Sequence, residues 1–467
     1  MAILFGEGTG KTTLSRVPLS GGAPRAVLEG ARYAGADWAP GGKDLAVLRN
    51  VEGRDRLESP IGRVLFETKG SLGSPRFSPR GDEIALFHVE TSISLLLVET
   101  SGRGRRVLST GWAGMSGVPC WTADGREIWF TASRAGENEA LYAVDRSGRD
   151  RLIARVPGTL ELDDIAADGR ALLAHHTILP VLMGQAPGQT AERDLSWLDL
   201  SLPADLSGDG KTLVFTEGGE GGGKSGSIYM RGTDGSPAVR LGEGLGGPLS
   251  PDGKWVVSIL RAAAGQAPKL VLLPTGAGES RSVPTPGLGV IDRTAWLPDG
   301  RNLLIVGTEP GHASRVYLLD SATGSRRPVT AEGVIFEGSG AISPGGEFFV
   351  GADRNFKREL YSLERGEARP IPGLRHWTTD SRFLPGEIPV QWTPDGRFLY
   401  VFRRGEVPVK VWLLDLETGQ KRLWKEIRPE GRGVLGINRL LISRDGRAYV
   451  YQTQSNVGEL YLVEGLK

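Results

Sequence analysis

The sequence contains very little cysteine and histidine and no surplus of either charge. Among 467 residues there is one cysteine, Cys120, and there are five histidines. A single cysteine excludes an internal disulfide and a Cys-rich metal site, but it does not decide the compartment. The 56 Lys and Arg nearly balance the 55 Asp and Glu. No long-range field therefore favours nucleic acid or an anionic membrane as a partner.

Long apolar runs are also missing. No run approaches the roughly 18 residues that a membrane-spanning helix needs. The first eleven residues, MAILFGEGTGK, have a short apolar stretch with no positive charge before it, so they do not resemble a secretory signal. Taken with Met1 as the true start, the sequence predicts a cytoplasmic protein.

Glycine and proline, by contrast, are abundant and follow a pattern. There are 68 Gly and 29 Pro, which indicates many turns and few helices. Residues 392–402 read WTPDGRFLYVF, a strand, a Pro-Asp-Gly turn and a second strand. Proline sets φ at the first turn position, Asp can accept hydrogen bonds from the local backbone, and Gly accepts positive φ. The phrase predicts a β-hairpin, and nothing in it performs chemistry.

The phrase occurs ten times. Neighbouring turn glycines lie between 39 residues (Gly42 to Gly81) and 50 residues (Gly396 to Gly446) apart. A β-rich repeat of that length fits one four-stranded blade of a β-propeller. The structural turn glycines are Gly42, Gly81, Gly125, Gly169, Gly210, Gly253, Gly300, Gly346, Gly396 and Gly446. We therefore predict an all-β fold of tandem β-propellers, with about ten four-stranded blades and a partial blade at the N-terminus.

Ten repeats exceed the 4 to 8 blades that usually close one propeller. We expect an incomplete N-terminal propeller at 1–195 and a C-terminal propeller of about six blades at 196–467. Residues 1–30 supply three strands of a blade without its inner strand, which we expect to lie upstream of Met1. The last repeat supplies three strands and then ends, and we expect Ala191 to Trp197 to close that blade as its outer strand.

Two kinds of motif resemble catalytic loops but are incomplete. Gly6 to Thr13 resembles a phosphate-binding loop, yet Phe5 stands where the first glycine belongs, and strand signals follow instead of a helix. Gly114 to Gly117 and Gly223 to Gly226 are fragments of the G-x-S-x-G nucleophile elbow outside a strand–turn–helix context. We predict a hairpin loop at Gly6 to Thr13, and no catalytic residue in any of the three segments.

The remaining chemical groups are dispersed. The histidines show no metal-binding spacing, and the turn aspartates recur one per repeat, which favours a structural role in the turn. The basic cluster Arg103, Arg105 and Arg106 is expected to be solvated. The histidines are His88, His175, His176, His312 and His376, and the turn aspartates are Asp124, Asp209, Asp252, Asp299, Asp395 and Asp445. We predict no metal site and no cofactor.

The repeated phrase, together with Leu-Tyr-x-Val-Asp strands such as Leu141 to Asp145, resembles the TolB-type propeller repeats. Residues 192–223, 234–255 and 459–467 also resemble the propeller region that follows the kinase domain in bacterial membrane-anchored serine/threonine kinases. The kinase signatures H-R-D and D-F-G are absent, so no kinase residue can be assigned here. As a fragment of such a receptor, the chain would be periplasmic or extracytoplasmic.

Two functions remain open from the sequence. The first is a non-catalytic sensor or scaffold whose loops and channel bind a protein, peptide or small ligand. The resemblance implies the sensory region of a kinase-type receptor. The second is the substrate-gating propeller of a prolyl-oligopeptidase or tricorn-like peptidase, which a G-x-S-x-G hydrolase domain would accompany. The residues that bind the ligand cannot be assigned from sequence.

Overall fold

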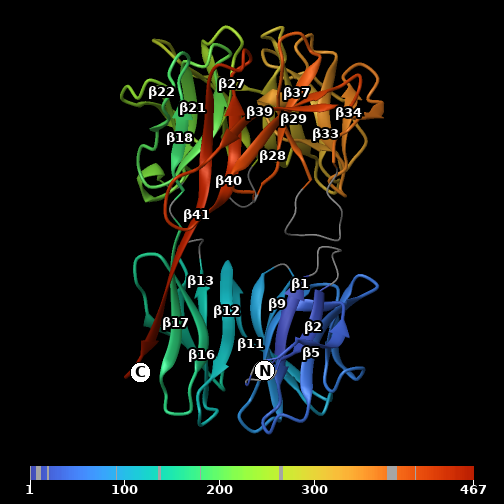
Figure 1. The fold of residues 1–467 in the computed structure, drawn as a ribbon, viewed down its shortest axis with the longest axis vertical. Helices are drawn as coiled ribbons and strands as arrows, with labels where there is room; N and C mark the ends of the chain where they lie inside the picture. Colours follow the sequence, from blue (N-terminus) through green and yellow to red (C-terminus); the bar gives the residue numbers. More distant parts are fainter. Residues whose placement is uncertain are drawn as a thin grey trace. The chain divides into compact units, whose positions relative to one another are not determined.

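The computed structural model describes residues 2–6, 12–17, 20, 22–90, 92–134, 138–178, 180–223, 225–261, 267–375, 386–404 and 406–466. The described chain is almost entirely β-strand, with two short 3-10 helices (Figure 1). It divides into two compact units. Unit 1 contains residues 1–178 together with 456–467, and unit 2 contains residues 179–455. The predicted limits, 1–195 and 196–467, differ from this division at residues 179–195 and in the last twelve residues.

Unit 1 is built of five antiparallel sheets. Three of them have four strands, and the first and the fifth have three. In chain order the sheets are β1 (Ala2–Gly6), β2 (Thr12–Arg16) and β3 (Arg25–Glu29); β4 (Ala31–Trp38), β5 (Leu45–Val51), β6 (Arg54–Glu58) and β7 (Val64–Thr68); β8 (Ser71–Phe77), β9 (Glu83–Val89), β10 (Ile93–Glu99) and β11 (Arg105–Trp112); β12 (Gly114–Trp121), β13 (Glu127–Ser133), β14 (Ala140–Asp145) and β15 (Asp150–Ala154); and β16 (Thr159–Ile165), β17 (Ala171–Ile178) and residues 456–463 of β41 (Tyr449–Val463).

The three strands expected in residues 1–30 are present as β1, β2 and β3. Within the described residues, β1 pairs only with β2 and has no partner on its other edge. That an inner strand lies upstream of Met1 stays a prediction.

Unit 2 is built of six four-stranded sheets. Five are continuous in sequence: β20 (Ser201–Leu206), β21 (Thr212–Glu217), β22 (Ser227–Gly232) and β23 (Val239–Glu243); β24 (Leu245–Leu249), β25 (Trp255–Leu260), β26 (Lys269–Pro274) and β27 (Arg281–Val283); β28 (Val290–Trp296), β29 (Asn302–Thr308), β30 (Arg315–Asp320) and β31 (Arg326–Pro328); β32 (Ile335–Phe336), β33 (Phe348–Ala352), β34 (Arg358–Ser362) and β35 (Ala368–Pro370); and β36 (Ile388–Trp392), β37 (Phe398–Phe402), β38 (Val409–Asp415) and β39 (Lys421–Ile427). The 3-10 helices are η1 (Glu220–Gly222) and η2 (Ser339–Ala341).

The sixth sheet of unit 2 joins the two ends of that unit. Its order is β40 (Val434–Ile442), the first part of β41, β18 (Leu182–Gln185) and β19 (Arg193–Asp194). Glu192 fixes this closure, because its two carboxylate oxygens accept hydrogen bonds from the hydroxyls of Tyr449 (2.5 Å) and Tyr451 (2.6 Å).

The strand pairing of this sheet corrects the sequence prediction. An outer strand does lie within residues 191–197, at β19. The third strand, however, is β18 and not residues 459–463, which pair with β17 in unit 1. Gly458 does not adopt positive φ, and β41 runs through it as one extended strand from unit 2 into unit 1.

The Pro-Asp-Gly turns have one geometry in all ten repeats. Each turn glycine has φ between 65° and 87° and donates its N–H to the carbonyl three residues earlier, as Gly396 does to Thr393 (2.9 Å). This is a type I turn followed by a left-handed residue, the common connection for hairpins of this loop length. Every repeat thereby enters its second strand in the same register.

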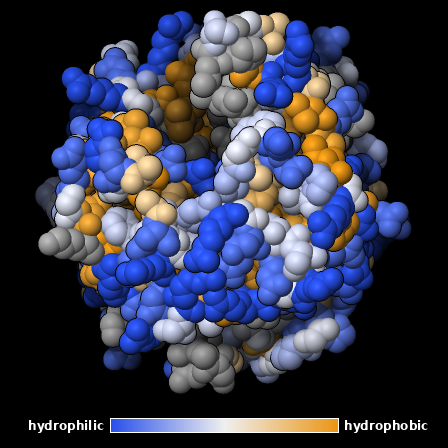
Figure 2. All heavy atoms as spheres, turned by 90° about the horizontal axis from the view of Figure 1, so that it is seen from below, coloured by the Kyte–Doolittle hydropathy of each residue, from blue (hydrophilic) through white to orange (hydrophobic). Residues whose placement is uncertain are grey.

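The hydrophobic core lies between neighbouring sheets. Leu303 to Val306 of β29 are all buried, and they alternate between two clusters. Leu303 and Ile305 pack with side chains of sheet β24–β27, whereas Leu304 and Val306 pack with those of sheet β32–β35. Strands that are covered on both faces are continuously apolar for this reason. On the face that Figure 2 shows, small patches of hydrophobic residues lie among hydrophilic ones.

Candidate functional site

The inner strands of all six sheets of unit 2 surround a common channel. Two adjoining cavities of about 510 and 520 Å³ lie along it, and each is lined by residues from β20, β24, β28, β36, β40 and the segment around η2. The cavities share Pro248, Gly340, Val390 and Leu441, so they meet at these residues. The channel is the candidate ligand site, because concave sites on a rigid frame are where small ligands and peptides usually bind.

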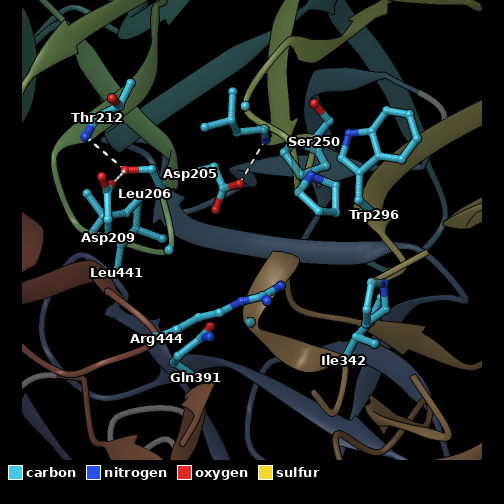
Figure 3. Close-up of a pocket in the computed structure, with 18 of the residues that line it drawn as sticks. Asp205, Leu206, Asp209, Thr212, Ser250, Trp296, Ile342, Gln391, Leu441 and Arg444 are labelled. Carbon is cyan, nitrogen blue, oxygen red and sulfur yellow. Dashed lines mark hydrogen bonds between the residues drawn. The ribbon is translucent and has the colours of Figure 1, made fainter. Parts of the chain in front are cut away.

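The first cavity lies on the side of the Pro-Asp-Gly turns (Figure 3). Its aspartates already have partners. Asp209 accepts hydrogen bonds from the Ser207 hydroxyl (2.6 Å) and the Lys211 amide (3.1 Å), and these bonds lower the pKa of Asp209. Asp205 accepts the amide of Leu249 in the next sheet at 2.8 Å. The carboxylates therefore hold turns and neighbouring sheets together, and they do not form a free acidic pair.

The second cavity contains three arginines, Arg293, Arg404 and Arg439, one from each of three regions of the ring. The Arg293 guanidinium donates to the backbone carbonyl of Phe336 (2.9 Å), and Nε of Arg404 donates to that of Asn438 (2.9 Å). Among the described residues, Arg439 has neither a hydrogen bond nor an ion pair, and Arg293 and Arg404 have no ion pair. Three cationic groups thus face one cavity without carboxylate partners.

Arg439 is surrounded by protein, yet its side chain is accessible to solvent inside the channel. Burial is the main cause that lowers the pKa of this guanidinium; the positive charges of Arg293 and Arg404 lower it further, and the carboxylates of Asp205 and Glu337 partly oppose this. Burial likewise lowers the pKa of Arg404. The two carboxylates that oppose this shift are engaged elsewhere: Asp205 accepts the Leu249 amide, and Glu337 lies 2.5 Å from Arg358. The three guanidinium groups of the second cavity therefore repel one another and are partly desolvated, and a bound anion would reduce this unfavourable energy.

The catalytic-looking motifs do not form a site. Ser116 lies near Thr131 and Glu139 and has no histidine partner. Cys120 is buried, and burial raises the pKa of its thiol to about 12, so it is not a reactive nucleophile. Residues 7–11 of the loop from Gly6 to Thr13, and Lys224 in the segment from Gly223 to Gly226, lie outside the described residues.

The histidines lie in separate places. The imidazole of His88 contacts Thr68, that of His175 contacts the Pro157 carbonyl, and that of His312 contacts Glu332. His176 contacts Asn456 and Glu161. His376 lies outside the described residues. In the described part of the chain, no group of three or more His, Cys, Asp or Glu is arranged to hold a metal ion.

The basic cluster Arg103, Arg105 and Arg106 is exposed to solvent, as expected, and two of its side chains also contact neighbouring residues. The Arg105 guanidinium lies over the Phe66 ring, 4.8 Å from its centroid, and Arg106 donates to the Arg146 carbonyl (2.7 Å). None of the helices that the structure describes is long and apolar enough to cross a membrane.

The three channel arginines were missed in the sequence analysis. Arg293 and Arg439 occupy the same place in their repeats, three residues before Trp296 and Ile442. Other repeats have Gly, Ser, Pro or an apolar residue there, so an alignment of the ten repeats would have shown two charged residues facing the axis. Arg404 follows a second strand and gives no such signal.

No protein-family model matches the chain, and no curated protein matches it either. Similar solved structures include TolB from Acinetobacter baumannii (15% identity, covering 70% of this chain and 77% of that one, TM-score 0.22). A putative TolB from Agrobacterium tumefaciens has 17% identity, covers 57% of this chain and 83% of that one, and gives a TM-score of 0.26. The fold is all-β and consists of tandem β-propellers, as the repeated antiparallel sheets show by themselves.

Two peptidases are also among the similar solved structures. A prolyl endopeptidase structure has 13% identity, with 78% of this chain and 50% of that one covered and a TM-score of 0.33. The tricorn protease has 14% identity, with 85% and 45% covered and a TM-score of 0.28. The chain therefore spans about half of each peptidase.

Proposed function

We propose that this chain is a non-catalytic binding module in which the channel of unit 2 receives an anionic group of a protein, peptide or small ligand. The observation that carries the proposal is the convergence of Arg293, Arg404 and Arg439 on one cavity without ion-pair partners. Arginine binds carboxylate and phosphate groups through several directed N–H donors. The incomplete catalytic motifs support a role in binding.

The proposal is tested by calorimetric titration of the protein with a short acidic peptide, citrate and inorganic phosphate. We expect at least one of them to bind, and Arg439→Met to weaken that binding about tenfold, as the loss of a charge-assisted hydrogen bond does. Arg444→Met is the matched control, because Arg444 lines only the first cavity. Binding that is equally strong in Arg439→Met, Arg293→Met and Arg404→Met would place the ligand elsewhere and refute the proposal.

The narrower hypothesis is that the module is the sensory region of a bacterial serine/threonine kinase-type receptor and lies outside the cytoplasm. The sequence resemblance of residues 192–223, 234–255 and 459–467 supports it. The genomic sequence around this reading frame tests it. A kinase domain and a hydrophobic span upstream are the expected result, whereas a hydrolase domain downstream would favour the peptidase alternative.

A further inference from the structure

The fifth sheet of unit 1 has three strands, whereas every complete repeat elsewhere has four. It consists of β16, β17 and residues 456–463 of β41, which pair antiparallel with β17 from Ala171↔Val463 to Ile178↔Asn456. In the part of the chain that the structure describes, no strand pairs with the other edge of residues 456–463. This edge, referred to below as the open edge, presents unpaired backbone N–H and C=O groups.

The side chains of the open edge are exposed on both faces of the sheet. Leu460, Tyr461 and Leu462 are 65%, 46% and 57% exposed, although successive side chains of a strand point to opposite faces. Outer strands of neighbouring sheets expose a single large apolar side chain, such as Val107 on β11 or Leu152 on β15. The open edge thus has the sequence of a third strand but the exposure of a strand that lacks its outer neighbour.

Other sheets show which side chains cover such a strand. Leu460 to Glu464 reads LYLVE and matches the third strands Leu141 to Asp145, Val316 to Asp320 and Val411 to Asp415. In each of these sheets an antiparallel fourth strand places an apolar residue opposite the aromatic one and an arginine opposite the next. The pairs are Tyr142↔Leu152, Ala143↔Arg151, Trp412↔Leu423, Leu413↔Arg422, Tyr317↔Pro328 and Leu318↔Arg327.

We propose that the open edge is a β-strand addition site for an extended segment of a partner protein that carries an Arg–apolar pair. The segment runs antiparallel to residues 456–463, with its apolar residue opposite Tyr461 and its arginine opposite Leu462. Backbone hydrogen bonds supply the affinity, and the two side chains set the register. The exposed carboxylates of Glu459, which lies within the edge and accepts the Tyr461 hydroxyl, and of Glu464, which directly follows the edge, favour a basic segment. The site is separate from the channel of unit 2, so neither proposal depends on the other.

The test uses a fluorescent peptide with the sequence of residues 148–155, GRDRLIAR, and measures its anisotropy on titration with the full chain. We expect saturable binding, weakened at least tenfold when Leu462 is changed to Lys and unchanged in Val107→Lys, which alters an equally exposed residue on an outer strand. Replacing the peptide's second arginine, the counterpart of Arg151, by glutamate should also weaken binding at least tenfold.

Three outcomes would overturn the proposal. If a scrambled peptide binds equally well, the positions of the apolar residue and the arginine do not set the register. Two further peptides carry N-methyl groups on alternate amides, one on the odd and one on the even positions; if both bind as well as the original peptide, binding does not use backbone hydrogen bonds. This measurement remains informative if Leu462→Lys does not fold. A concentration-dependent dimer that is lost in Leu462→Lys shows that the occupant of the edge is a second copy of this chain.

Discussion

Two arginines near the channel of unit 2 stand in opposite situations. Arg358 is buried and lies 2.5 Å from the Glu337 carboxylate, while Arg439 forms no ion pair with any described residue and has the positive charges of Arg293 and Arg404 close to it. We predict that Arg358→Met lowers stability by about 2 kcal/mol, because it leaves a largely buried carboxylate uncompensated. We predict that Arg439→Met leaves the thermal unfolding temperature unchanged or raises it.

Thermal unfolding of both variants beside Arg444→Met checks this pair of expectations. Arg444 also lines the channel, and its side chain forms no hydrogen bond or ion pair with a described residue, so it controls for the Arg→Met change itself. If Arg358→Met and Arg439→Met lower the unfolding temperature equally, the Arg439 side chain contributes to the stability of the folded protein and the prediction is wrong.

The two tyrosines that hold Glu192 predict an alkaline loss of stability. Burial, and next the hydrogen bond to the Glu192 carboxylate, raise the pKa of Tyr449 and of Tyr451. Because the folded pKa exceeds the unfolded value of about 10, the stabilisation is fully present below about pH 10 and is lost as the pH rises beyond it.

The double variant Tyr449→Phe/Tyr451→Phe removes these two ionisable groups. We predict a lower unfolding temperature at pH 7, from the lost hydrogen bonds, but a smaller further decrease between about pH 9.5 and 11 than in the original protein. Tyr229→Phe is the control, since the Tyr229 hydroxyl makes no hydrogen bond with a described residue. If the unfolding temperature falls in parallel with pH in all three proteins, Tyr449 and Tyr451 do not cause the alkaline loss of stability.

At the scale of the element, the hairpin turns predict the acid limit of stability. Hydrogen bonds from a Ser or Thr hydroxyl and from a backbone amide lower the pKa of the turn aspartates, among them Asp209, Asp252 and Asp395. A lowered folded pKa means that the stabilisation is present above about pH 4 and is lost as the pH falls through the folded value.

Asp209→Ala tests this expectation in one turn. We predict that the variant is about 1 kcal/mol less stable than the original protein at pH 7, which is the usual net contribution of a hydrogen bond. On acidification from pH 7 to pH 3, the variant should lose less stability than the original protein does. Asp44→Ala is a matched control from the first repeat, where the turn is Gly41-Gly42 and the nearby Asp44 side chain forms no hydrogen bond with a described residue. If Asp209→Ala and the original protein lose the same stability between pH 7 and pH 3, the ionised Asp209 carboxylate does not stabilise the turn.

The hairpins could be predicted because their cause is local. Pro, Asp and Gly at fixed positions set the backbone of one turn, and every repeat carries that signal itself. The pairing of β18 with β41 could not be predicted in detail, since it joins Leu182 to Gln452 and no local pattern distinguishes a third strand that arrives from so far away. The channel arginines were missed because they converge only when the sheets form a ring.

At the scale of the whole molecule, β41 belongs to both units. Residues 449–455 lie in the last sheet of unit 2, and residues 456–463 lie in the last sheet of unit 1. We predict that deleting residues 456–467 exposes β17 and destabilises unit 1, while unit 2 keeps its sixth sheet.

Hydrogen–deuterium exchange measures the effect of this deletion strand by strand. Amides of β16 and β17 should exchange at least tenfold faster, and those of β18 and β40 should be unchanged. Removing only residues 464–467, which follow β41, is the control. A comparable loss of protection in β18 would show that the two halves of β41 are not energetically separable.

The shared strand also bears on how this chain can be made. Domains usually fold in the order in which they leave the ribosome, N-terminal first. Here neither unit can complete its last sheet until the ribosome has passed β41, because unit 1 waits for residues 456–463 and unit 2 waits for residues 434–455. During most of synthesis β17 and β18 therefore carry unpaired edges. A nascent chain of this kind depends on chaperones for longer than two independent propellers of the same length would.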